Sequence, residues 1–65
     1  MKYRIRYREY DVDDNQGGLV EFLEVTEAEF FKIENGFVVA WLEDNETRIP
    51  DIYINANNVL TIEPF

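Results

Sequence analysis

The stretch at residues 26–36, TEAEFFKIENG, decides the fold class of this chain. Thr26 followed three residues later by Glu29 matches the capping box that opens many helices. Asn35 and Gly36 match a helix end, because Gly readily adopts the left-handed conformation of a C-terminal cap. The stretch therefore predicts one short helix of about two turns between these two signals.

A β-hairpin is predicted before this helix. Residues 2–10, KYRIRYREY, alternate strictly between apolar and charged side chains, which is typical of a strand. Residues 19–25 form a second apolar segment, and the Asp-, Asn- and Gly-rich residues 13–18 supply the turn between them. The apolar side of the first strand consists of Tyr3, Ile5 and Tyr7, and its basic side of Lys2, Arg4, Arg6 and Arg8.

Three further strands are expected after the helix, at residues 37–42, 49–54 and 59–62. The first of them, FVVAWL, is apolar throughout, as in strands that are covered on both faces. The predicted order is β-β-α-β-β-β. We therefore expect an α+β fold, a small curved antiparallel sheet or barrel with one short packed helix. The 65 residues form a single small domain, residues 1–65, because a chain of this length has room for one core.

The composition excludes most familiar catalytic chemistry. The sequence contains no Cys, no His and no Ser, so it lacks the usual nucleophiles, the usual general base and the usual zinc ligands. We expect no enzymatic activity, no cofactor and no metal. No apolar run is long enough to span a membrane or to act as a signal peptide. A cytoplasmic protein is therefore expected.

The charge of the chain is unevenly distributed. It carries 14 acidic and 6 basic residues, a formal net charge of -8. Four of the basic residues lie within residues 2–8, which leaves residues 9–65 with a net charge of -12. Three explanations remain open. The basic residues pair with acidic residues of the same chain such as Glu21 and Glu24, or with Tyr10 nearby they bind nucleic acid, or the acidic body binds a basic protein.

Two acidic segments are candidate sites. The residues predicted to form a partner-binding acidic patch around one turn are Glu43, Asp44, Glu46 and Asp51. A second segment, with Asp11, Asp13 and Asn15 at alternate positions, matches the first half of a calcium loop. Gln16 and Phe22 then stand where that loop requires Gly and Glu, so we interpret the segment as a polar hairpin turn.

The leading hypothesis is a non-enzymatic acidic binding module that acts through protein–protein contact. Residues 53–63, YINANNVLTIE, resemble the closing segment of several small β-rich bacterial and bacteriophage proteins, which implies an origin in a bacterium or its phage. By analogy, a short, acidic, cysteine-free and aromatic-rich chain suits a phage or prophage accessory protein, such as an inhibitor that imitates nucleic-acid charge. Two alternatives remain. One is a nucleic-acid-binding domain that uses the basic first strand, which the net negative charge disfavours. The other is a structural homodimer formed by edge-strand pairing.

Overall fold

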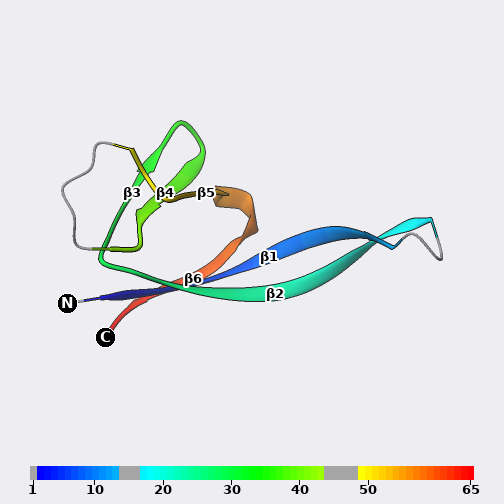
Figure 1. Cartoon of the computed structure of the whole chain (residues 1–65), viewed down its shortest axis with the longest axis horizontal. Coiled ribbons are helices and arrows are strands. Elements are labelled where there is room, and N and C mark those ends of the chain that lie inside the picture. The colour runs from blue at the N-terminus through cyan, green and yellow to red at the C-terminus, as the bar shows by residue number, and fades with distance from the viewer. Residues whose placement is uncertain (1, 14–16, 44–48) are drawn as a thin grey trace.

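The chain forms six strands and one short turn of 3-10 helix (Figure 1). The structure, a computed structural model, describes residues 2–13, 17–43 and 49–65. The elements are β1 (Tyr3–Asp13), β2 (Gly18–Ala28), β3 (Phe30–Glu34), β4 (Phe37–Trp41), β5 (Ile52–Asn55), the 3-10 turn η1 (Ala56–Asn58) and β6 (Val59–Pro64). None of the described residues belongs to an α-helix.

The strands form two antiparallel three-stranded sheets, with the orders β2-β1-β6 and β3-β4-β5. Only Glu29 separates β2 from β3, so the chain passes directly from the first sheet into the second at this residue. The Glu29 backbone N–H donates to the Trp41 carbonyl oxygen at 2.9 Å and so ties the corner to β4. As a result the second sheet lies across one end of the first (Figure 1).

The predicted helix, and with it the α+β fold class, is wrong. Residues 26–36 contain the end of β2, the bend at Glu29, all of β3 and a tight turn. The backbone φ angles of Asn35 and Gly36 are 53° and 80°, which suits the two-residue turn of a β-hairpin rather than a helix cap. β3 then pairs with β4 in an unbroken register from Phe30 opposite Trp41. These contacts with a later strand override the local capping signals.

Each of the other predicted segments contains a strand, although the one predicted at residues 49–54 begins only at Ile52. The prediction of a single curved sheet or barrel is wrong, because these strands form two separate sheets. β1 and β2 pair antiparallel over eleven positions, from Tyr3 opposite Ala28 to Asp13 opposite Gly18. The alternation of the first strand is also confirmed, since Ile5 and Tyr7 are buried while the basic residues lie on the opposite face.

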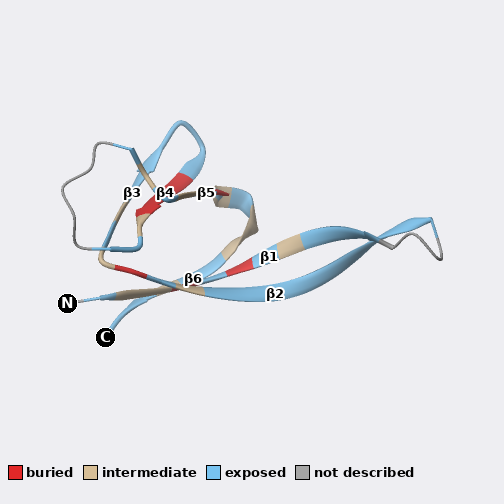
Figure 2. Cartoon of the chain, viewed as in Figure 1, coloured by how far each residue is buried: buried red, intermediate tan, exposed pale blue. Residues whose placement is uncertain are grey.

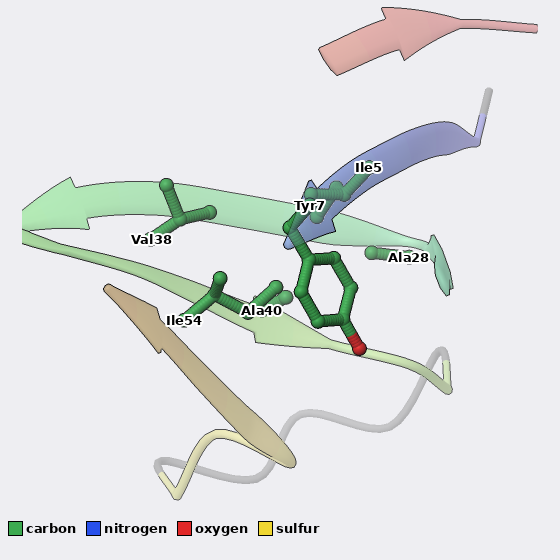
Figure 3. Close-up of a cluster of buried hydrophobic side chains, with 6 residues drawn as sticks. All are labelled: Ile5, Tyr7, Ala28, Val38, Ala40 and Ile54. Atoms are coloured by element: carbon green, nitrogen blue, oxygen red, sulfur yellow. The ribbon is translucent and has the colours of Figure 1, made fainter. Parts of the chain in front are cut away.

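The core lies between the two sheets at the end where they overlap (Figures 2 and 3). It is small, and it takes side chains from β1, β2, β4 and β5. Its buried members are Ile5, Tyr7, Ala28, Val38, Ala40 and Ile54. The Tyr7 hydroxyl lies 3.3 Å from the Thr26 hydroxyl, which gives its polar end a hydrogen-bond partner.

The connection between β5 and β6 is fixed by hydrogen bonds. The Asn55 side-chain oxygen accepts from the Asn57 backbone N–H at 3.0 Å and caps η1. The Ala56 N–H donates to the Gly36 carbonyl oxygen at 2.9 Å, which joins η1 to the β3–β4 turn. The Asn-rich break predicted before the last strand is therefore confirmed, and it acts through side-chain capping.

The far half of the β1–β2 hairpin extends beyond the core. β6 pairs with β1 only from Tyr3 to Tyr7, with a register shift between Arg6 and Tyr7. Residues 8–13 and 18–23 continue as a two-stranded segment, which we call the ribbon (Figure 1). The ribbon gives the molecule its elongated dimensions of 42 × 23 × 20 Å. A membrane-spanning helix is not found among the described residues.

Candidate functional site

The basic residues of β1 lie beside acidic residues of the same chain. Lys2 Nζ is 3.6 Å from a Glu29 carboxylate oxygen, and an Arg4 guanidinium nitrogen is 3.8 Å from Glu27. The shortest of these ion pairs joins Arg8 Nε to Glu21 at 3.1 Å. Each pair links β1, or Lys2 directly before it, to β2 or to Glu29 at the corner after β2. Three of the four basic residues are therefore neutralised within the fold.

Two further features complete the basic face. The Arg4 guanidinium also lies 4.5 Å from the centre of the Phe65 ring, so both of its partners belong to this chain. Arg6 is exposed and stands between Val25 of β2 and Thr61 of β6 in the sheet. It has no ion-pair partner among the residues that the structure describes. Arg6 is thus the one arginine of the predicted basic stripe without an acidic partner in the described part of the chain.

The predicted acidic patch is only partly within the described chain. Asp44 and Glu46 lie outside the described residues. Glu43 is exposed, two residues after the end of β4. The Asp51 carboxylate accepts a hydrogen bond from the Leu42 N–H at 2.7 Å, and its own N–H donates to the Ala40 carbonyl oxygen at 2.9 Å. Asp51 therefore holds the end of β4 beside the start of β5.

The calcium-like segment begins inside β1. The Asp11 carboxylate accepts from the Val12 N–H at 2.8 Å, and Asn15 lies outside the described residues. Within the described ranges, no group of three or more acidic residues is arranged to hold a metal ion.

The feature that sequence reasoning missed is the exposure of β2. Eight consecutive residues, 18–25, are exposed, and we call them the β2 edge (Figure 2). Leu19 is 73% and Leu23 68% exposed although both are large and apolar. β2 pairs with β1 on one side only, since it is the outer strand of its sheet. Its apolar exposed members are Leu19, Val20, Phe22, Leu23 and Val25.

The register between β1 and β2 assigns the exposed apolar side chains of β2 to the two faces of the ribbon. Leu19 lies opposite Val12, and Leu23 opposite Arg8, on the face that carries the basic residues. Phe22 lies opposite Glu9 on the other face, beyond the end of the core. Both faces of the ribbon therefore combine apolar and charged side chains.

The outer face of the second sheet carries four aromatic rings that pack in pairs, although Phe30, Phe37 and Tyr53 remain exposed. Phe30 and Trp41 lie with ring centres 5.3 Å apart, and Phe37 and Tyr53 with ring centres 6.4 Å apart. Val39 lies between these pairs in the register and is only 3% exposed. The rings thus form a second small apolar cluster around Val39. The prediction that the apolar strand β4 is covered on both faces therefore holds for its central residues, Val38, Val39 and Ala40, while Phe37 is exposed.

Comparison of the chain with protein-family models, curated proteins and solved structures finds no match. The functional argument therefore rests on the charge and geometry of the described residues.

Proposed function

We propose that this chain is a non-enzymatic binding module that binds a positively charged protein. The observation that carries the proposal is the pairing of Lys2, Arg4 and Arg8 with glutamates of the same chain. Because these basic groups are already neutralised, the net charge of -8 is left as excess acidity on the surface. A surface of one sign attracts partners of the opposite sign and accelerates their association.

The same pairing disfavours the nucleic-acid alternative. A phosphate backbone must compete with Glu21, Glu27 and Glu29 for the basic side chains, and the excess negative charge repels it. We expect no binding to single-stranded DNA or RNA at about 50 mM salt, where phosphate contacts are strongest. Within the proposal, the acidic surface suits a phage or prophage accessory or inhibitor protein that occupies a basic, nucleic-acid-binding surface of its target.

The experiment starts with capture of partners from a bacterial lysate on the immobilised chain. A captured protein is then purified, and its affinity is measured by calorimetry at several salt concentrations. The test variant replaces Glu9, Glu24 and Glu63 with Gln, since none of these side chains forms an ion pair with another described residue. Arg6→Gln is the matched control, because it removes an unpaired charge of the opposite sign.

The proposal predicts a basic partner whose affinity falls with rising salt and with the triple Gln substitution. Arg6→Gln should leave the affinity unchanged or increase it. A partner that binds independently of salt and of the three glutamates would contradict the proposal. So would a partner, or a single-stranded nucleic acid, whose binding depends on Arg6.

A further inference from the structure

The β2 edge is the least protected strand edge in the molecule. Proteins protect edge strands from pairing with other chains by keeping them short, or with Pro, Lys or bulges. The other outer strands have such features: β5 has four residues, β3 has five and carries Lys32, and β6 ends in Pro64. β2 has eleven residues, no Pro, no Lys and no shift in its register with β1.

The backbone of the β2 edge is suited to accept another strand. In an antiparallel pair, alternate residues direct their N–H and C=O groups away from the neighbouring strand. β2 has β1 on one side only, so these groups form an unpaired row along its outer side. The ribbon projects from the core, and this row is therefore accessible over most of its length (Figure 1).

The acidic side chains of β2 determine which kind of strand can pair with it. Glu21, Glu24 and Glu27 are its only charged residues. Glu21 and Glu27 are paired with arginines of β1, whereas Glu24 lies opposite Tyr7 and has no ion pair in the described part of the chain. A second copy of β2 would bring three more glutamates and no basic residue to the interface. A strand with basic residues would instead complement it.

We infer that the β2 edge accepts an extended, basic segment of the partner protein as a fourth strand beside β2. Backbone hydrogen bonds to the unpaired row hold this segment, and a lysine or arginine of the segment faces Glu24. Apolar residues at the intervening positions of the segment lie on the other face of the sheet, beside Leu19, Leu23 or Val25. The inference rests on the proposed function, to which it adds the site and the form of the partner.

The test uses a synthetic seven-residue peptide of alternating lysine and valine, acetyl-KVKVKVK-amide, and measures its affinity at physiological salt. The control peptide has the same sequence with every internal backbone nitrogen methylated. Methylation keeps the charge and the side chains but removes the hydrogen-bond donors on both edges of the peptide. Strand addition predicts that methylation weakens binding at least about tenfold, because several backbone hydrogen bonds are lost.

Two variants of the chain locate the site. Glu24→Lys should weaken binding of the unmethylated peptide about tenfold, by replacing an attractive cross-strand pair with a repulsive one. Glu63→Lys is the matched control, since it makes the same change of net charge on β6, at the other side of the sheet. It should weaken binding less than about threefold, because salt screens charges beyond about 8 Å. Circular dichroism establishes that both variants keep the fold.

Several results would overturn the inference. These are equal binding of the two peptides, a larger effect of Glu63→Lys than of Glu24→Lys, and absence of peptide binding at millimolar concentration. Light scattering that shows a dimer abolished by Glu24→Lys would overturn it in favour of a second copy as the occupant. If the inference fails while the captured partner still depends on Glu9, Glu24 and Glu63, the proposed function stands without strand addition. If that dependence is absent too, both fail.

Discussion

Replacement of Ile5 by Val tests whether the core lies between the two sheets. Ile5 is fully buried and is one of the two largest side chains with almost no exposed surface. The substitution removes one methylene and leaves a small cavity, which costs about 0.5–1.5 kcal/mol at such a site. A chain of this size has a total stability of roughly 3–10 kcal/mol, so the loss is a measurable fraction of it.

The matched control is Ile33→Val, the same change on β3, where the side chain is 68% exposed. Its effect should stay within about 0.5 kcal/mol. Urea unfolding can be followed through Trp41, the only Trp of the chain. With a slope of about 1 kcal/mol per molar urea, the midpoint of Ile5→Val should fall by roughly 1 M and that of Ile33→Val by less than half as much.

This comparison also separates the observed strand from the predicted helix. On a helix at residues 26–36, Ile33 would share the buried face with the residues that cover the sheet. In the structure it lies near the end of β3, largely in solvent. A loss at Ile33 as large as the loss at Ile5 would refute both the all-β fold and the placement of the core.

Three further substitutions test other parts of the fold. Gly36→Ala should lower the free energy of unfolding by about 1 kcal/mol, because φ is 80° at this turn, and a thermal melt measures the loss; an unchanged Tm would contradict the hairpin turn. Ala28→Leu should lower the free energy of unfolding, measured in urea, by about 1–3 kcal/mol, because the larger side chain overpacks the core. A stabilised variant would show that the site has spare volume. Arg8→Gln should lower the free energy of unfolding by less than about 1 kcal/mol, because both partners of its ion pair with Glu21 are about half exposed. A larger loss, measured by urea unfolding at low salt, would mean that the pair stabilises the fold by more than charge neutralisation.

The strands of this protein could be predicted from sequence because their signals are local. The alternation in residues 2–10 matches β1, and the apolar run in residues 37–42 matches β4. Asn35 and Gly36 were interpreted as a helix end, but the same two residues also suit a hairpin turn. The choice between them depends on pairing with β4, which a pattern within residues 26–36 does not contain.

The candidate site was predictable only in part. The position of the basic residues on one face followed from their spacing, and their pairing with glutamates was one of the three explanations left open. The identity of the pairs depends on the register, which places Arg4 opposite Glu27 and Arg8 within reach of Glu21. The β2 edge was not predictable, because it depends on β2 being an outer strand of its sheet, which only the strand order β2-β1-β6 shows. Sequence shows the apolar residues of β2 but not what covers them.

The central claim is that a basic strand adds to the β2 edge, and amide hydrogen exchange measured by NMR tests it most directly. With the lysine–valine peptide present, alternate amides within residues 18–25 should exchange more slowly, because they gain hydrogen-bond partners. The amides of β5 and β6 should exchange at unchanged rates, and the fully N-methylated peptide should protect none of these amides. Protection that is absent from β2, or that appears instead on another strand, would contradict the account.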